Sequence, residues 1–421
     1  MVRKLKRTEI GDIPIDWELQ TFEETFNVLS SNTLSRENLN NRSGVVRNIH
    51  YGDILTKFSE VLDCKEEDIP YIDDLSLLTS SAQLLRDGDI VIADTAEDET
   101  VGKVTEVQNL GNGKLVAGLH TIPCRVKKGD FVPGWLGYYM NSHMYHNQII
   151  PYITGIKVSS ISKSAIANTW IVIPPIEEQK RIVEILSQID LLIRKEQEVT
   201  DKITAVKMGC LSKMFPKAGE SIPEMRLPGF DGDWEKQKLI EVCDYVDYRG
   251  KTPSKTDEGI FLVTAKNVKA GYIDYDVSKQ YISENVYEEV MHRGMPQIGD
   301  VLITTEAPCG NVAQVNREDI ALAQRIIKYR GHNDVVNNTY LKHYLLSSTF
   351  QRILLAKSSG GTVQGIKGSI LHQQEIMLPK YKEQIDIGRN LDNLDHLITL
   401  HQQKYHKYMK IKSGLISMLI R

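Results

Sequence analysis

Three short motifs contain residue types that could act on phosphates or nucleic acids. Residues 249–252 contain a Gly-Lys-Thr run, but a phosphate-cradling loop needs a glycine five positions before Gly250, and Tyr245 stands there. The triplets DCK at 63–65 and EQK at 178–180 have the acid-x-lysine spacing of some nucleases, yet such triplets arise by chance in a chain that is 25% charged. The motifs therefore predict neither an ATP site nor a nuclease.

Methyl transfer and metal chemistry are likewise not indicated. An adenine methyltransferase carries an Asn/Asp-Pro-Pro-aromatic tetrapeptide, whereas Pro174 and Pro175 are flanked by Ile173 and Ile176. The histidines show no HExxH spacing, and the five cysteines form no CxxC pair. We predict no catalytic residue and no metal ligand in this chain.

Composition describes an ordinary globular protein with enough residues for two or three domains. The chain has 421 residues, a formal net charge of -4 and a pI near 6.3. No segment has the pattern of a signal peptide or approaches the 18 or so apolar residues of a membrane span, so we expect a cytoplasmic protein without membrane contact. Because there is no basic surplus, any DNA binding must rest on local patches.

The longest element that the sequence predicts is a helix over 174–214. Pro174 and Pro175 fit only its start, and Glu177 and Glu178 follow where the helix dipole favours negative charge. Apolar residues then recur at spacings of three and four, so one stripe follows one face. At 1.5 Å per residue, 35 to 38 residues would make a rod of roughly 50 to 57 Å, which needs a partner along its seam.

The partner lies in the same sequence. The passage that starts at Ile366 repeats the passage that starts at Ile161, with a constant offset of 205 residues. The offset pairs, among others, Pro174 with Pro379, Gln179 with Gln384, Asp190 with Asp395 and Gly209 with Gly414. The chain is therefore a tandem duplication.

Each copy of the repeat begins with a run of short predicted strands. DWELQ at 16–20 and DWEKQ at 233–237 open the two halves, and GDIVIADT at 88–95 matches GDVLITTE at 299–306. We expect strands at 45–51, 89–93, 101–107, 121–126 and 170–173, with counterparts at 261–264, 300–305, 312–315, 326–329 and 375–378. One shorter helix is expected in each half, at 133–150 and at 338–355.

These patterns predict an α+β fold in which two similar mixed α/β domains are joined by two long antiparallel helices. Similar rods bury their stripes most economically when they pack antiparallel about a pseudo-twofold axis. The expected organisation is a first globular domain, a long helix, a linker with a second globular domain, and a second long helix, over residues 1–173, 174–215, 216–378 and 379–421.

The order of these parts resembles the specificity subunit of type I restriction-modification enzymes. The similarity rests on a PPxxEQ-type helix after the first globule, a PxxxEQ-type helix after the second, and the passages at 160–190 and 222–235. The second copy departs from the pattern, because Lys380 follows Pro379 and Gly388 lies in the first turns of the helix.

The resemblance implies a function and a set of partners. Each domain would read one half of a split, asymmetric sequence in double-stranded DNA, and the paired helices would set the spacer. The helices would also hold two methyltransferase subunits, to which motor-nuclease subunits add. The chain itself would be non-catalytic and hold no cofactor, so S-adenosylmethionine, ATP and Mg are expected on the partner subunits.

Base edges are read by polar side chains on loops that project from a rigid core, and phosphates are bound by Lys, Arg and backbone amides. Loops at 47–51, 118–121 and 154–160 qualify in the first half, with counterparts at 266–267, 323–325 and 359–367 and a basic segment at 248–255. The loops around Gly155 and Gly360 are favoured, because they sit at the same offset and precede the last strand before each rod. The candidate DNA-binding residues are Arg47, Asn48, His50, Tyr51, His120, Lys157, Ser159, Ser160, Arg249, Lys251, Lys266, Asn267, Gln324, Arg325, Thr362, Gln364 and Lys367.

Two other classes of function remain open at this point. One is a fused methyltransferase or nuclease, against which the missing motifs argue. The other is a non-catalytic coiled-coil scaffold, which would bind protein but select no DNA sequence.

Overall fold

The computed structural model describes residues 4–155, 157–248, 253–360 and 364–420. The chain divides into two compact units. Unit 1 comprises residues 1–195 and 405–421, and unit 2 comprises residues 196–404. Among the described residues, no helix is both long and apolar enough to cross a membrane.

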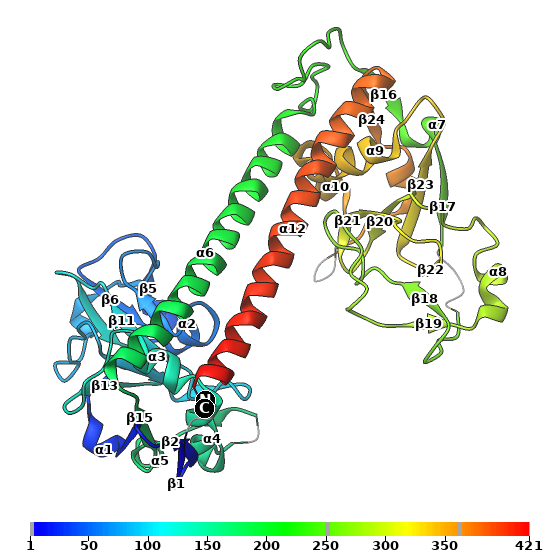
Figure 1. Ribbon diagram of the computed structural model, residues 1–421. Helices are drawn as coiled ribbons and strands as arrows, with labels where there is room; N and C mark the ends of the chain where they lie inside the picture. The colour runs from blue at the N-terminus through cyan, green and yellow to red at the C-terminus, as the bar shows by residue number, and fades with distance from the viewer. Residues whose placement is uncertain (1–3, 156, 249–252, 361–363, 421) are drawn as a thin grey trace. The chain divides into compact units, whose positions relative to one another are not determined.

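Unit 1 is built on a five-stranded sheet in the order β4-β13-β9-β11-β7 and a four-stranded sheet in the order β12-β6-β8-β5 (Figure 1). Three two-stranded pairs, β1-β2, β10-β14 and β3-β15, complete it. The strands are β1 Leu5–Thr8, β2 Gly11–Pro14, β3 Glu18–Thr21, β4 Phe26–Val28, β5 Leu39–Asn40, β6 Val46–Ile49, β7 Val61–Asp63, β8 Tyr71–Ile72, β9 Ile90–Ala93, β10 Thr95–Ala96, β11 Val104–Gln108, β12 Lys114–Ala117, β13 Thr121–Val126, β14 Ser159–Ser160 and β15 Trp170–Ile173. The helices are α1 Phe22–Thr25, α2 Tyr51–Thr56, α3 Trp135–Met140, α4 His143–Ile149 and α5 Lys163–Ala167.

Unit 2 has a smaller set of sheets with the orders β17-β23-β20-β21, β19-β18-β22 and β16-β24. Its strands are β16 Glu235–Lys238, β17 Cys243–Asp247, β18 Ile260–Val263, β19 Tyr281–Ile282, β20 Val301–Thr305, β21 Cys309–Gln314, β22 Ile320–Leu322, β23 Ile326–Gly331 and β24 Glu375–Leu378. Its short helices are α7 Leu239–Val242, α8 Tyr287–Val290, α9 Asn338–Leu346, α10 Ser348–Lys357 and α11 Gly368–His372.

The predicted long helix is confirmed as α6, which spans Ile176–Lys213, and the helix α12 spans Tyr381–Leu419. Gly388 does not interrupt α12. A side chain at this position would approach the backbone nitrogen of Tyr340 to 3.1 Å, so the glycine lets α9 pack closely against the helix.

Each long helix is tied to its domain by a buried glutamine at the same repeat position. The Gln179 side chain accepts a hydrogen bond from the Val132 backbone N–H and donates to the carbonyl oxygens of Asp130 and Pro174, at 2.9 to 3.1 Å. Gln384 makes the same three bonds, to residues 337, 335 and 379. All partners follow the offset of 205, so both helices start from one buried structure.

The strand that precedes each long helix pairs with the strand that opens its unit. Ile173 in β15 lies opposite Glu18 in β3, and Leu378 in β24 lies opposite Glu235 in β16. Beneath these pairs lie Trp17 and Trp234, which are 1% and 3% exposed. The tryptophans are therefore core residues, and the matching DWELQ and DWEKQ runs are explained by packing.

Within each unit, parts of α6 and α12 are joined by an ion pair whose lysine is buried. In unit 1 the Lys412 ammonium of α12 bonds Asp190 of α6 and also Glu60. In unit 2 the Lys207 ammonium of α6 bonds Asp395 of α12. Lys207 and Lys412 occupy the same repeat position, as do Asp190 and Asp395, so the two helices exchange roles from one unit to the other.

The shorter helix expected in each half is in fact two helices. Ser142 ends α3 and caps α4 by accepting from the Tyr145 N–H, and Ser347 separates α9 from α10 by accepting from the Phe350 N–H. A serine oxygen can accept from an N–H at the start of a helix, so a new helix can begin at each serine without leaving that N–H unpaired.

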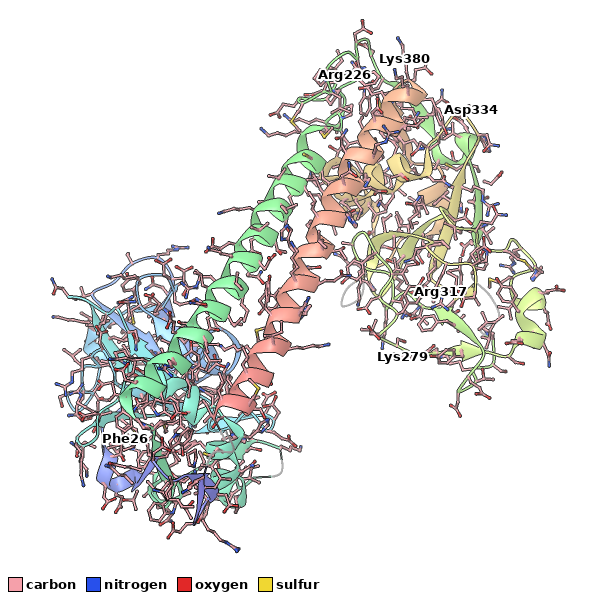
Figure 2. All side chains as sticks on the ribbon, in the orientation of Figure 1. Phe26, Arg226, Lys279, Arg317, Asp334 and Lys380 are labelled. Atoms are coloured by element: carbon pink, nitrogen blue, oxygen red, sulfur yellow. The ribbon has the colours of Figure 1, made fainter. Side chains whose placement is uncertain are left out.

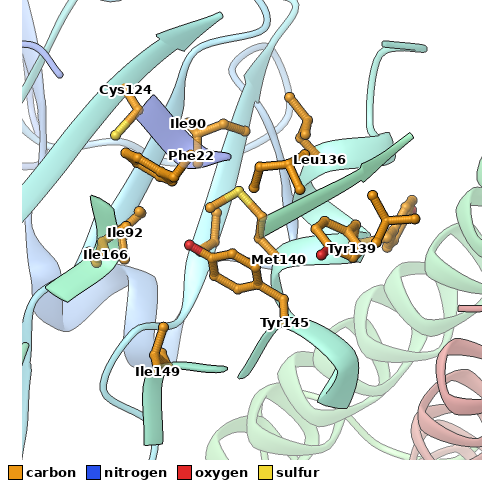
Figure 3. Close-up of a cluster of buried hydrophobic side chains, with 14 of the residues drawn as sticks. Phe22, Ile90, Ile92, Cys124, Leu136, Tyr139, Met140, Tyr145, Ile149 and Ile166 are labelled. Atoms are coloured by element: carbon orange, nitrogen blue, oxygen red, sulfur yellow. The ribbon is translucent and has the colours of Figure 1, made fainter. Parts of the chain in front are cut away.

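The main core of unit 1 lies between the five-stranded sheet and the helices α3, α4 and α5. Figure 3 shows Ile90 and Ile92 of β9 facing Leu136, Tyr139 and other apolar side chains. Ile416 and Ile420 of α12 belong to the same cluster.

In unit 2, Arg226 forms a double hydrogen bond with Glu383 near Lys380, where α12 starts (Figure 2).

Candidate nucleic-acid interface

The candidate loops of unit 1 emerge where two neighbouring parallel strands end. Strand β12 pairs in parallel with β6, with Ala117 opposite Ile49. The chain leaves β6 into His50 and Tyr51, and leaves β12 into the loop that carries His120. Because parallel neighbours end at the same edge, the two loops meet, and the rings of Tyr51 and His120 lie 5.3 Å apart.

His120 has an unusual backbone for a residue with a side chain. Its φ is +54°, in the left-handed region that few non-glycine residues occupy. The carbonyl oxygen of His120 accepts from the Asp94 N–H at 3.1 Å, and its Nδ1 atom lies 3.2 Å from the Thr95 hydroxyl. The side chain is 46% exposed, so a fixed backbone presents a histidine to solvent.

The third loop joins this group through a short strand pair. Strand β14 runs antiparallel to β10, with Ser160 opposite Thr95 and Ser159 opposite Ala96. Gly155, with φ of +113°, permits the tight turn, because a side chain there would lie 1.9 Å from the Val158 carbonyl oxygen. The structure thus brings together the predicted residues His50, Tyr51, His120, Ser159 and Ser160.

The same backbone arrangement occurs in unit 2. Strand β22 pairs in parallel with β18, and the loop after β22 carries Arg325, at the repeat position of His120. The φ of Arg325 is +72°, and its carbonyl oxygen accepts from the Thr305 N–H at 2.9 Å. The side chain is 48% exposed. Both units therefore hold a non-glycine residue in a left-handed conformation at one repeat position, which is typical of functional sites.

Glu306 stands beside Arg325, in the position that Thr95 has in unit 1. The Arg325 guanidinium lies 3.5 Å from the Glu306 carboxylate. Glu306 forms an antiparallel bridge with Gly365, which also bridges Ser359. These residues and Lys367 line a depression of about 230 Å³.

Some predicted residues point inward. Asn48 is fully buried and accepts a hydrogen bond from Asn32 at 2.7 Å. Asn267 is fully buried too, and its amide bonds Thr264 and two backbone carbonyls. Arg47 is half-buried and donates to the Cys64 carbonyl oxygen at 2.6 Å. All three support the loops in this structure.

The remaining predicted residues are spread around the two sites. Lys157 is exposed in the Gly155 loop, and Lys266 is exposed after β18. In unit 2, Gln324 is half-buried, while Gln364 and Lys367 are exposed. Three further predicted contacts, at Arg249, Lys251 and Thr362, lie outside the described residues.

His50 has a structural function as well. Its Nδ1 accepts from the Gly52 N–H at 3.1 Å and so caps α2. Burial, together with the nearby Arg36, lowers the pKa of His50, which keeps the ring neutral and able to accept. The ring also packs on Tyr51 at a centroid distance of 4.6 Å, so it helps to hold the exposed aromatic group.

The residues that sequence reasoning missed are Asp94, Thr95 and Glu306. They end the matched runs GDIVIADT and GDVLITTE, which the sequence shows to be equivalent. The sequence could have indicated Thr95 and Glu306, because they occupy the last position of those runs, where one copy has a threonine and the other a glutamate. A change of charge at a matched strand end marks a surface position.

One group of metal-ligand types occurs among the described residues. His343, Asp392 and Asp395 lie with their ligand atoms within 4.8 Å of one another. The Lys342 ammonium contacts both carboxylates, and Lys207 contacts Asp395. Two lysines already neutralise the two carboxylates, so the group is better suited to an internal ion network than to a divalent cation.

The fold is that of a duplicated protein in which each α/β domain is followed by a long helix. Residues 14–205 and 231–407 match the family described as type I restriction modification DNA specificity domain. The chain belongs to this family, and its function is the recognition of DNA sequence.

Individual proteins agree with this assignment over nearly the whole chain. The putative type I restriction enzyme MjaX specificity subunit of Methanocaldococcus jannaschii is 24% identical over 99% of this chain and 95% of its own length. The solved S subunit of a type I restriction-modification system from M. genitalium is 13% identical, covers 100% of this chain and 99% of its own, and has a TM-score of 0.55. A solved chain of another type I R-M system, 18% identical over 97% of this chain and 98% of its own, also has a TM-score of 0.55. At these identities the solved chains confirm the fold.

Proposed function

We propose that each unit reads one half of a split, asymmetric sequence in double-stranded DNA. The observation that carries the proposal is the paired loop site: both units fix a left-handed residue beside a bridged strand end, but present different side chains from it. Two units that share a scaffold but expose different side chains suit a DNA target whose two halves differ in sequence. On this view residues 1–173 and 216–378 form the two target recognition domains.

The long helices, over 174–215 and 379–421, set the spacing between the half-sites. We propose that they pack antiparallel as a coiled coil, with the domains inverted about a pseudo-twofold axis. The exchange of ion-pair roles between Lys207 and Lys412 supports such symmetry.

The same helices provide a docking surface for two methyltransferase subunits. Leu192 and Leu397, at one repeat position, are 38% and 39% exposed, and Val206 and Ile411, at another, are 55% and 37% exposed. Apolar side chains left in water at matched positions suit two copies of one partner. Motor-nuclease subunits join through that complex, and the partners supply S-adenosylmethionine, ATP and Mg in the cytoplasm. The chain contributes recognition and no chemistry of its own.

Domain exchange tests the two-reader proposal. Residues 21–160 are replaced by the equivalent segment of another family member, and the full chain is produced with the methyltransferase subunits of its own system. Mapping of methylated adenines in the host genome should show one half of the motif changed and the other kept. A change in both halves, or in neither, would reject the proposal.

The helix length can be tested with the same readout. One extra turn in each long helix adds about 5.4 Å and should lengthen the spacer by about one or two base pairs. An unchanged spacer would reject the ruler function.

A further inference from the structure

The loop sites of the two units differ most in charge. In unit 1 the bridged strand end and the left-handed residue are Thr95 and His120, and a hydroxyl faces an imidazole. In unit 2 the same positions hold Glu306 and Arg325, so a carboxylate faces a guanidinium at 3.5 Å. Both charged side chains are close to half exposed, at 44% and 48%.

An exposed ion pair of this kind would ordinarily contribute little to stability. It also would not require the unfavourable backbone of Arg325. The backbone is held by two hydrogen bonds, because the Thr305 N–H and, at 3.3 Å, the Thr305 hydroxyl both donate to the Arg325 carbonyl oxygen. The scaffold therefore keeps the Arg325 backbone in one place at a small cost in strain, which favours a recognition function over a stabilising one.

The backbone around Glu306 is also held by hydrogen bonds. Its bridge to Gly365 is extended by two hydrogen bonds of 2.9 Å between the backbones of Ser359 and Gly365. The Ile366 N–H donates to the Thr305 carbonyl oxygen at 2.9 Å. Lys367 follows at the rim of the depression, with an exposed ammonium that suits a phosphate.

A guanidinium and a carboxylate side by side match one kind of base pair. In the major groove guanine presents two acceptors, O6 and N7, which arginine contacts with two N–H groups, and cytosine presents the N4 amino donor, which glutamate accepts. These groups are neighbours on the edge of a G·C pair. An A·T pair would instead leave thymine O4, an acceptor, and the thymine methyl near the carboxylate.

We propose that Arg325 and Glu306 read one G·C base pair in the half-site of unit 2. Arg325 donates to guanine O6 and N7, and Glu306 accepts from cytosine N4 while it orients the guanidinium. This inference rests on the proposed function, because it requires that unit 2 reads a half-site. Unit 1 has Thr95 and His120 at these positions, so it presents a hydroxyl and an imidazole in place of the carboxylate and the guanidinium.

The test uses the full chain produced with the methyltransferase subunits of its own system, and maps methylated adenines in the host genome. The variants are Arg325→Gln and Glu306→Gln. Glutamine pairs with adenine, so Arg325→Gln should relax or shift one G·C position of one half-site toward A·T. Glu306→Gln should lower discrimination at that same position by about tenfold or more.

Two controls make the result specific. Arg317→Gln removes another exposed arginine of unit 2, which is labelled in Figure 2. Arg317 pairs with Asp319 and does not line the depression, so its loss should leave the motif unchanged. His120→Gln should alter only the other half-site. If a site variant abolishes methylation, circular dichroism of the purified chain tells misfolding from lost recognition, and Arg325→Lys, which keeps the charge, should retain guanine with reduced selectivity.

The outcomes separate the inference from the function on which it rests. Two outcomes with a two-part wild-type motif would overturn the inference alone. In one, Arg325→Gln and Glu306→Gln leave the motif unchanged. In the other, the half read by unit 2 contains no fixed G·C pair. A wild-type chain that directs methylation to no two-part motif would overturn the proposed function and the inference with it.

Discussion

In unit 1 the left-handed residue of the candidate interface is His120, and in unit 2 it is Arg325. The backbones around them agree: the His120 carbonyl oxygen accepts from the Asp94 N–H, and the Arg325 carbonyl oxygen accepts from the Thr305 N–H at the equivalent position. The exposed side chains differ, with an imidazole in unit 1 and a guanidinium in unit 2. The comparison indicates that buried polar contacts preserve the scaffold, while the exposed positions are free to diverge between the two copies.

The buried acid-arginine pairs illustrate the preserved part. Arg125 makes two hydrogen bonds to Asp89 in unit 1, and Arg330 makes two to Asp300 in unit 2. Both aspartates are 1% exposed. A buried carboxylate tolerates no loss of its partner, so this pair is fixed by energetics and not by the target.

The largest expected difference between the units concerns the lysines that join α6 to α12. Lys412 faces two carboxylates, Glu60 and Asp190, which raise its pKa although burial alone would lower it. Asp395, the partner of Lys207, also has Lys342 at 3.6 Å. Lys412→Met should therefore destabilise unit 1 by about 4 kcal/mol, and Lys207→Met should destabilise unit 2 by only about 1–2 kcal/mol.

Hydrogen exchange read by mass spectrometry would measure both effects, since it reports each unit separately. Lys202→Met serves as the control, because Lys202 is exposed on α6 and lies 3.9 Å from Glu198. Equal losses in the two units would contradict the asymmetry.

Removal of the buried glutamines should, in contrast, lower the free energy of unfolding by the same amount in the two units. Gln179→Ala or Gln384→Ala leaves one backbone N–H and two carbonyl oxygens without their partner, so each should cost about 3 kcal/mol in its own unit. Chemical denaturation of the full chain would measure the cost, with Gln197→Ala as an exposed control on α6. A clearly larger cost in one unit would show that the two helix starts are not energetically equivalent.

A smaller effect should depend on pH and occur only in unit 2. Burial lowers the pKa of His343 to about 4, against the opposing influence of Asp392 and Asp395 and with the help of Lys342. Because the unfolded chain takes up the proton first, stability is full above about pH 6.5 and falls as the pH drops toward 4, by at most about 3 kcal/mol.

The repeat position of His343 is Tyr138 in unit 1, which donates to Asp190 at 2.6 Å and offers no such titration. His343→Gln should remove the part of the pH dependence that belongs to unit 2 between pH 4 and 6.5. Thermal melting across that range, with hydrogen exchange to assign the unit, would check it. Persistence of the same slope in the variant would refute the assignment to His343.

Sequence alone predicted the parts of the fold that depend on repetition and periodicity. The offset of 205 identified the equivalence of Gln179 with Gln384 before any geometry was known, and the apolar period predicted α6. Periodicity could not reveal the breaks at Ser142 and Ser347, because a serine that caps a helix looks like any polar residue within one. It also could not show that Leu192 and Val206, which belong to the apolar stripe, remain exposed.

The sequence predicted which loops form the candidate interface, but it predicted less well which of their side chains face solvent. His120 and Arg325 were identified from their types and loops, whereas their left-handed backbone depends on hydrogen bonds to strands distant in sequence. Asn48 and Asn267 have residue types that read adenine, but the same amides also satisfy buried backbone groups, and here they do so. Residue type cannot decide between the two, because burial is set by the neighbouring strands.

The membership of residues 405–421 in unit 1 has a consequence for the synthesis of the protein. Ile416 and Ile420 complete a core whose other buried members lie before residue 190, and Lys412 forms ion pairs with Glu60 and Asp190. A ribosome that has produced only the residues of unit 1 that precede unit 2 has therefore made a domain with an open core and with two carboxylates that lack their lysine. Translation must pass through the whole of unit 2 before unit 1 is finished, so a prematurely stopped chain would present protease-sensitive surface in its first half.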